Sequence, residues 1–333
     1  MKTVLVTKPL HPAALKRLSE AAKVVTPYTA SGPELRSLLP DVHAIILCAG
    51  WNVGAAELDL GTQLEVVGRH GAGMDNLDVP AATDRCIPVV FTPYGPTQST
   101  AEHTLLLILG CARRIYMLDR AVRSGDFSIR DRSEAMGHEV HGKALGVVGF
   151  GRIGQRLAEM CSVALHMPVF VFDPFVDTQM VADWGATHEE DLIELAGKVD
   201  VLAVHAPHTP ATHHLISREV ISAMKPGALL ISVSRGPLVD EAALIEALQS
   251  GHLGGAGLDV FDPEPPAADN PLLQMEQVVL SPHVGSFTDE ARRLMGLTVV
   301  EDTLKALRGE RPQYLANPDV WERRRGLQTG RER

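Results

Sequence analysis

Three polar side chains in the second half of the chain have types and positions suited to proton transfer and to the binding of negatively charged oxygens. Arg235 follows the apolar run Leu229–Ser232, and His283 follows Val278–Leu280. Glu264 lies between them in an Asp-Pro-Glu-Pro-Pro segment. An arginine fork pairs with two oxygens, a histidine exchanges a proton near neutrality, and a neighbouring carboxylate orients it as imidazolium. Taken singly, each residue also fits a structural role in a turn or cap.

A glycine-rich loop supplies a second chemical signal, Gly149-Phe150-Gly151-Arg152-Ile153-Gly154. An apolar run, Leu145–Val148, leads into the loop, and a helical pattern continues from Gln155. In this context the first glycine permits a tight turn, the second lets a pyrophosphate approach, and the third lets helix and strand pack closely. The helix N-terminus then offers N–H groups to phosphates. The pattern predicts a dinucleotide site.

Asp173 indicates which dinucleotide is bound. It ends the next predicted strand, Val169–Phe172, nineteen residues after Gly154. A carboxylate there can accept hydrogen bonds from an adenosine ribose and repels a 2′-phosphate, and no arginine follows directly. We therefore expect NAD rather than NADP, although a glycine turn with an incidental aspartate remains the structural alternative.

Composition limits the other classes of function. The 333 residues suggest about two domains, and the formal charge of −10 argues against broad nucleic-acid or acidic-membrane binding. No apolar run has the length of a membrane span, and the N-terminus lacks the pattern of a signal peptide. We therefore expect a cytoplasmic protein. The cysteines are scattered in a way that fits neither disulfides nor a metal site: Cys48, Cys86, Cys111 and Cys161.

Strand and helix patterns alternate through both halves of the chain, which predicts the α/β class with parallel, doubly covered sheets. Two longer helices are expected, at residues 98–119 after Thr97 as N-cap and at residues 288–307. We interpret the arginine-rich tail, residues 322–333, as solvated or disordered. Ten runs read as buried strands: 3–6, 44–48, 64–67, 88–91, 144–148, 169–172, 199–204, 228–232, 255–260 and 278–280.

In their order, these motifs resemble the D-isomer-specific 2-hydroxyacid dehydrogenases, a family with phosphoglycerate- and hydroxypyruvate/glyoxylate-acting members. The resemblance runs from about Leu64 to about Thr288. Its most specific parts are the glycine loop, Val204-His205-Ala206-Pro207, Ser234-Arg235-Gly236, Val239-Asp240-Glu241, Gly257-Leu258-Asp259-Val260-Phe261, Glu264-Pro265 and Pro282-His283.

The resemblance implies an oxidoreductase that transfers a hydride between NAD(H) and a small D-2-hydroxy acid or 2-keto acid. Arg235 would bind the substrate, and Glu264 would hold His283 as proton donor or acceptor. Both Arg235 and His283 would also contact the cofactor. The other implied cofactor residues are Thr100, Gly149, Gly151, Arg152, Ile153, Gly154, Asp173, His205, Pro207, Thr212, Val233, Ser234, Asp259, Gly285 and Ser286. Ala72 and Gly73 would bind the substrate carboxylate, and Arg235 and His283 would also contact the substrate.

The resemblance also implies a domain plan with two Rossmann-like domains. A cofactor domain at residues 101–285 would be inserted into a substrate domain formed by residues 1–100 and 286–333. The family is usually dimeric through its cofactor domain, so we expect a homodimer to which residues 127–141 contribute. The short chain after His283 resembles members without a C-terminal regulatory domain. His70 and His103 do not match the family's proton-relay position, and we interpret both as structural.

The identity of the acid and the preferred direction stay open at this point. Thr97 and Thr100 replace the Asn and Val that many family members have there, and Tyr94 and Pro96 add bulk and stiffness near the expected mouth of the site. These residues lie where substrate side chains would differ. The same fold also serves NAD-sensing corepressors, which bind partners and need little turnover. Oxidation of NADH by small 2-keto acids distinguishes the enzyme from the sensor.

Overall fold

The computed structural model describes residues 1–325 and divides the chain into two units. Unit 1 contains residues 1–96 and the segment that begins at Ser286, and unit 2 contains residues 97–285. The expected boundary after residue 100 falls inside a helix, α5, which begins at Thr97. Within residues 1–325, no helix is long and apolar enough to cross a membrane.

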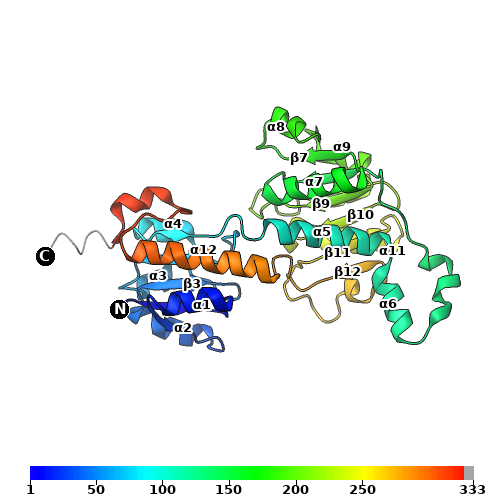
Figure 1. Cartoon of the computed structure of the whole chain (residues 1–333). Helices are drawn as coiled ribbons and strands as arrows, with labels where there is room; N and C mark the ends of the chain where they lie inside the picture. Colours follow the sequence, from blue (N-terminus) through cyan, green and yellow to red (C-terminus); the bar gives the residue numbers. More distant parts are fainter. Residues whose placement is uncertain (326–333) are drawn as a thin grey trace. The chain divides into compact units, whose positions relative to one another are not determined.

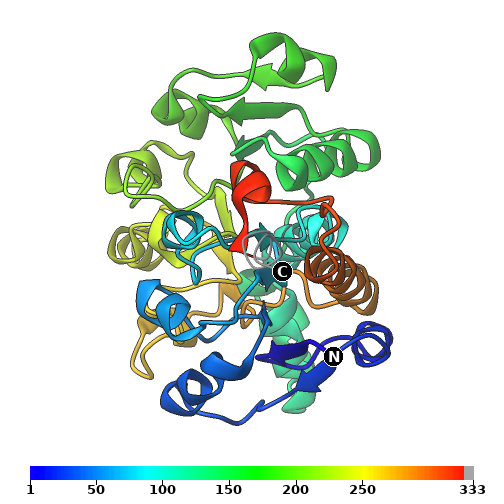
Figure 2. The same cartoon turned by 90° about the vertical axis from the view of Figure 1, so that its left-hand side faces the viewer.

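Unit 1 is built on a five-stranded parallel sheet in the order β2-β1-β3-β4-β5. Helices α1 and α12 lie on one face, and α2, α3 and α4 lie on the other (Figures 1 and 2). The strands are β1 Thr3–Val6, β2 Lys23–Val25, β3 Ala44–Leu47, β4 Val66–Arg69 and β5 Val89–Val90. The helices are α1 Pro12–Ser19, α2 Gly32–Leu38, α3 Ala55–Leu60, α4 Val79–Asp84 and α12 Asp289–Leu307, with short 3₁₀ turns at Leu39–Asp41 and Pro318–Arg323.

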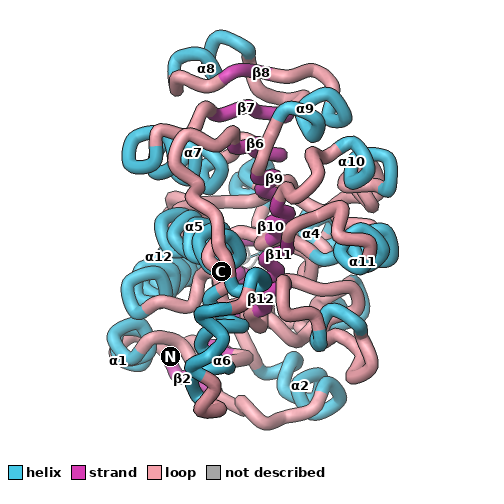
Figure 3. The backbone as a smooth tube through the Cα atoms, turned by 90° about the vertical axis from the view of Figure 1, so that its right-hand side faces the viewer, coloured by secondary structure: helices cyan, strands magenta, loops and turns pink. Residues whose placement is uncertain are grey.

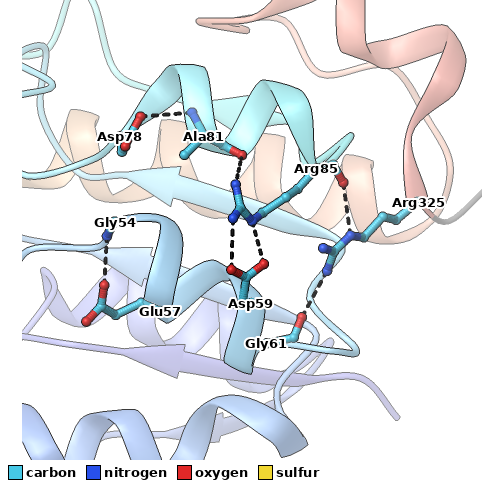
Figure 4. Close-up of polar contacts among 8 residues, drawn as sticks. All are labelled: Gly54, Glu57, Asp59, Gly61, Asp78, Ala81, Arg85 and Arg325. Atoms are coloured by element: carbon cyan, nitrogen blue, oxygen red, sulfur yellow. Dashed lines mark hydrogen bonds and ion pairs between the residues drawn. The ribbon is translucent and has the colours of Figure 1, made fainter.

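The end of the described chain packs against unit 1. The Arg325 side chain donates hydrogen bonds to the carbonyl oxygens of Gly61 and Arg85, at 3.0 and 2.9 Å (Figure 4). Arg85 itself forms a two-pronged ion pair with Asp59. The expectation of a solvated tail is therefore wrong for Arg324 and Arg325, because arginines can anchor a chain through backbone carbonyls, whereas Glu322 and Arg323 are exposed as expected. The rest of that predicted tail, 326–333, lies outside the described residues.

Unit 2 is built on a seven-stranded parallel sheet in the order β12-β11-β10-β9-β6-β7-β8 (Figure 3). Helices α5 and α7 cover one face, and α9, α10 and α11 cover the other. The strands are β6 Leu145–Val148, β7 Val169–Phe172, β8 Thr187–His188, β9 Val201–Val204, β10 Leu229–Ser232, β11 Gly255–Leu258 and β12 Val278–Leu280. The helices are α5 Thr97–Ala112, α6 Ile115–Arg123, α7 Arg152–Leu165, α8 Thr178–Asp183, α9 Leu192–Lys198, α10 Arg218–Ala223 and α11 Glu241–Gln249. Short 3₁₀ turns lie at Phe127–Asp131, Ser133–Ala135, Gly236–Leu238 and Pro271–Gln274.

Both sheets have the predicted parallel, doubly covered architecture, and the central strands explain why. All four residues of β3, and likewise of β6, β9 and β10, are buried, as expected of strands covered on two faces. Thr288 caps α12 by accepting a hydrogen bond from the Ala291 amide, with Asp289 and Glu290 in the first turn as expected.

Two local expectations are wrong, and two edge strands were not predicted. The single helix expected over residues 98–119 is two helices, because Arg114 adopts a left-handed backbone conformation with φ of 51° between α5 and α6. Thr97 is the first residue of α5 rather than its cap, and its buried hydroxyl has no hydrogen-bond partner among the described residues. The edge strands β2 and β8 are absent from the predicted set. They are two or three residues long and partly exposed, so they carry little apolar pattern.

Candidate active site

The predicted site residues of unit 2 follow the carboxyl ends of six strands of its sheet. The glycine loop follows β6, Asp173 follows β7, and His205 follows β9. Arg235 comes after β10, Asp259 after β11 and His283 after β12. Parallel strands all end at one edge, and β6 and β9 flank the point where the strand order reverses. Ligands of open α/β sheets bind at this place.

The glycine loop has the close approaches that its sequence predicts. Gly149 has a φ of 92°, and a Cβ there would lie 2.6 Å from the Ala206 nitrogen. A Cβ on Gly154 would lie 2.4 Å from the carbonyl oxygen of Gly149. Gly151, in contrast, faces open space and precedes α7 without a side-chain cap. The first turn of α7, with Arg152 and Ile153, thus offers N–H groups toward an open approach.

Asp173 is held beside this loop. One of its carboxylate oxygens accepts a hydrogen bond from the Phe150 amide at 2.8 Å, and the other accepts one from the Phe175 amide at 2.9 Å. Each oxygen keeps capacity for a second donor. A ribose with two hydroxyl groups is a suitable donor for a carboxylate fixed in this way.

The loop after β9 contains the residues predicted for the adenosine side. The His205 amide donates to the Val148 carbonyl, which brings this loop next to the glycine turn. Burial lowers the pKa of His205 to about 4, and its Nε2 has no hydrogen-bond partner among the described residues. The hydroxyl of Thr212 accepts from the Thr209 amide and donates to the Pro207 carbonyl, which closes the turn 207–212.

Arg235 lies at the end of β10 in extended backbone, immediately before a 3₁₀ turn. The hydroxyl of Ser234 donates to the Val204 carbonyl at 2.8 Å, which ties this segment to β9. Gly236 is required by packing, since a Cβ there would lie 1.8 Å from the Phe261 carbonyl oxygen. Val233, two residues before the arginine, is buried. Arg235 is half-buried, and its Nη1 donates to the Ser234 carbonyl at 2.6 Å.

His283 and Glu264 form the contact that the motif implies. Nδ1 of His283 lies 2.8 Å from Oε1 of Glu264, and both side chains are exposed. Arg235 follows β10 and His283 follows β12, and β11 lies between these two strands. The carboxyl ends of β10 and β12 are therefore about 10 Å apart.

Asp259 is 1% exposed and binds the loop that carries His283. Its carboxylate accepts hydrogen bonds from the Val284 and Gly285 amides at 2.9 and 2.8 Å and from the Ser281 hydroxyl at 2.5 Å. Burial by itself raises the pKa of Asp259, but the hydrogen bonds outweigh burial and hold the pKa below its usual value. Thr100 of α5 lies beside Gly285 and Asp259 at this end of the sheet.

The two residues predicted to grip a carboxylate belong to unit 1. The loop containing Ala72 and Gly73 wraps around Arg69, which donates from Nε to the Gly73 carbonyl and from Nη1 to the His70 carbonyl. In residues 1–325, the N–H groups of Ala72 and Gly73 have no hydrogen-bond acceptor. Burial lowers the pKa of His70 to about 4, which favours a neutral, structural histidine. Ser286 is the first residue of the second segment of unit 1.

Two residues at this site were not predicted. Nε2 of His103, on α5, lies 2.8 Å from the Ser281 hydroxyl and 3.4 Å from Oδ1 of Asp259. The sequence contained a weak signal for His103, since it follows Thr100 by three residues and so shares its helix face. Ser281 precedes Pro282-His283 directly, but nothing in the sequence shows its partner.

Comparison with known proteins agrees with this geometry. The family model "D-isomer specific 2-hydroxyacid dehydrogenase, NAD binding domain" matches residues 105–285. The D-3-phosphoglycerate dehydrogenase of Methanocaldococcus jannaschii is 38% identical over 327 residues, which are 98% of this chain and 62% of that protein. The chain thus spans less than two thirds of the length of this curated relative.

Two solved structures are similar over nearly the whole chain. The TT0316 protein of Thermus thermophilus has a TM-score of 0.88 and 36% identity, covering 94% of this chain and 99% of its own. An NADPH-dependent glyoxylate/hydroxypyruvate reductase of Sinorhizobium meliloti, solved with NADP and malonate, has a TM-score of 0.85 and 30% identity, covering 95% and 97%. The chain therefore belongs to the D-isomer-specific 2-hydroxyacid dehydrogenase family and contains its NAD-binding domain.

Proposed function

We propose that the chain is an NAD-dependent dehydrogenase that interconverts a small 2-keto acid and the corresponding D-2-hydroxy acid. The observation that carries the proposal is the 2.8 Å contact between His283 and Glu264. His283 and Arg235 follow β12 and β10, which have only β11 between them in the sheet. A proton donor and a cation at the same edge of the sheet match the needs of carbonyl reduction.

The residues of unit 2 fit the dinucleotide. The open approach at Gly151 and the uncapped start of α7 suit a pyrophosphate. The Asp173 carboxylate, held by two amides, is suited to bind the hydroxyl groups of an adenosine ribose. Nε2 of the buried His205 has no hydrogen-bond partner among the described residues, and a bound cofactor could supply one. NAD, when bound, supplies the acceptor or donor of the hydride. The charge of Asp173 favours NAD over NADP.

The protein side chains stabilise the charge that develops on the substrate oxygen and transfer the proton. Arg235 holds the substrate oxygens, so that negative charge growing on the carbonyl oxygen during reduction meets a guanidinium. His283 gives its proton to that oxygen as the carbonyl carbon receives the hydride, and takes the proton back in the oxidation. Glu264 compensates the imidazolium and fixes the ring. Water returns the proton to His283 after each reduction.

The substrate is a short acid that carries its carbonyl next to a carboxylate. Unpaired N–H groups of Ala72 and Gly73 support binding of that carboxylate by backbone. The similar proteins named above act on phosphoglycerate or on glyoxylate and hydroxypyruvate, as their names state. Hydroxypyruvate, glyoxylate and phosphohydroxypyruvate are therefore the first acids to test.

The test is the oxidation of NADH by these acids, followed by absorbance, with the wild type and His283→Ala. The variant should lose about 10²–10⁴-fold in kcat, the usual contribution of a positioned acid–base group. His138→Ala, an exposed histidine outside the site, is the control and should keep wild-type kcat. NADH binding without turnover of any acid would contradict the proposal and favour an NAD-sensing protein on the same fold.

We also propose that the chain forms a homodimer through unit 2. Large apolar side chains are exposed on α5, on α6 and on the segment after α6, which projects from the sheet of this unit (Figure 1). They are Leu106, Leu109, Ile115, Tyr116, Val122, Phe127 and Met136. Exposed apolar surface of this extent is typical of an interaction surface.

A further inference from the structure

His283 has a backbone conformation that needs external support. Its φ of 54° lies in the left-handed region, which is unfavourable for a residue with a Cβ. Residues in such conformations persist only where surrounding contacts determine them, and they concentrate at functional sites. The backbone conformation at this position sets the direction of the imidazole toward Glu264.

Asp259 is the source of that support. Its backbone carbonyl accepts a hydrogen bond from the His283 amide at 2.8 Å. Its carboxylate accepts one from the Val284 amide and another from the Gly285 amide. One buried residue thus receives the N–H groups of three consecutive loop residues. Any rotation of the Asp259 carboxylate would release two of them.

Ser281 and His103 fix the orientation of this carboxylate. The Ser281 hydroxyl has one proton and donates it to Oδ1 of Asp259 at 2.5 Å. At its 2.8 Å contact with Nε2 of His103, the same hydroxyl oxygen must therefore accept, so Nε2 carries a proton. His103 is only 16% exposed and belongs to α5, which packs on β10 and β11. The chain of contacts thus anchors the His283 loop to a helix of the core.

We propose that His103 and Ser281 are positioning residues for the proton transfer by His283. Neither residue touches Glu264. They act by holding Asp259, which binds the amides of residues 283–285 and so keeps His283 in its left-handed conformation. The inference rests on the proposed role of His283. It assigns the positioning of the His283 loop to the side chains of His103 and Ser281.

The first test is kinetic and uses His103→Leu and Ser281→Ala. Both should lower kcat by about 10- to 100-fold, since small misplacements of a catalytic group have effects of this size. The KM for NADH should stay near wild type. The primary isotope effect on kcat, measured with NADH deuterated at the transferred position, should rise because the chemical step becomes slower. Ser281→Thr, which keeps the hydroxyl, should restore most of kcat.

Cys111→Ala is the matched control. Cys111 is buried on the same helix beside Gly257 of β11, so its truncation costs stability without touching the loop. It should lower the melting temperature but leave kcat and the isotope effect unchanged. Equal kcat and isotope effects in His103→Leu, Ser281→Ala and wild type would overturn the proposal.

The second test needs no turnover. Hydrogen exchange of the backbone amides at residues 283–285, followed by NMR or mass spectrometry, should accelerate at least tenfold in both variants and not in Cys111→Ala. Unchanged exchange would show that the two residues do not hold the loop. If wild-type protein reduces no 2-keto acid, the proposed function fails by itself, and the exchange result still decides whether His103 and Ser281 position the loop.

Discussion

At the scale of a single residue, we propose that Asp173 selects between NAD and NADP. Its two oxygens are already held by the Phe150 and Phe175 amides, so the carboxylate is fixed where a ribose would bind. We expect a preference for NADH over NADPH in kcat/KM. Asp173→Ala should reduce the NADH value by about 10- to 100-fold, the worth of a hydrogen bond to a charged group, and narrow the preference. Equal efficiency of both cofactors in wild type would contradict this assignment.

Arg235 offers a test that separates binding from chemistry. Lysine keeps the charge but loses the planar fork, so Arg235→Lys should lower kcat by roughly 10- to 100-fold. This loss is smaller than the ~10²–10³-fold fall in kcat that follows complete removal of an oxyanion donor. NADH affinity and melting temperature should stay unchanged. A rise in KM alone would restrict Arg235 to ground-state binding. Joint loss of stability and NADH affinity would instead indicate a residue that shapes the turn before Gly236. Arg218→Lys, in an exposed ion pair with Glu246, is the control.

At the scale of elements, two glycines of one loop should respond in opposite ways. Alanine at Gly154 would meet the Gly149 carbonyl, so Gly154→Ala should destabilise unit 2 by about 1–3 kcal/mol. Gly151 faces open space with an ordinary φ of −72°, so Gly151→Ala should fold normally. Its methyl group would occupy the approach to α7, and NADH affinity should fall about tenfold or more.

Trp184 provides the measurement for this comparison. It is the one tryptophan in residues 97–285, and its ring lies 6.3 Å from that of Phe150 in the glycine loop. Energy transfer from Trp184 to bound NADH should report affinity, and urea unfolding should report stability. Normal NADH affinity in Gly151→Ala would show that the phosphates do not approach at this residue.

For the whole molecule, we predict a dimer that depends on the segment after α6. Phe127 and Met136 are 68% and 70% exposed, so Phe127→Glu with Met136→Glu should leave each chain folded and shift the assembly to monomers. Sedimentation should give twice the chain mass of 35.9 kDa for wild type and one mass for the double variant. Ile193→Glu, on α9 across the sheet, is the control. Wild-type protein that sediments as a monomer would refute the dimer.

Each unit also contains a buried neutral histidine that makes stability depend on pH. Burial lowers the pKa values of His70 and His205 to about 4, while an unfolded chain takes up the proton near 6.5. As the pH falls from about 7 to about 5, the unfolded state gains protons that the folded state does not, so each histidine lowers stability by on the order of 2 kcal/mol. His70→Gln and His205→Gln should each flatten this pH dependence in urea unfolding. An unchanged slope would show that neither histidine is held neutral.

Local patterns in the sequence were sufficient to predict the fold class and many of the candidate site residues. Apolar strands alternating with helices predicted two doubly covered parallel sheets, because burial on both faces leaves a readable run of apolar residues. The glycine loop and Asp173 were predictable because their chemistry depends on neighbours close in the chain. Arg235, Glu264 and His283 were predicted from motifs in a fixed order; Arg235 and His283 follow strands, and Glu264 lies in the loop after β11.

Only the tertiary structure decided the rest. The support of the His283 loop comes from residues 103, 259 and 281, and nothing local marks a helical histidine as the partner of a serine that lies far along the chain. The break at Arg114 and the anchoring of Arg325 on Gly61 likewise depend on contacts between distant segments. Hydrophobic patterns in the sequence indicate which residues are buried. The hydrogen-bond partner of a buried polar group depends on which groups lie close to it in the folded chain, and the sequence does not show this.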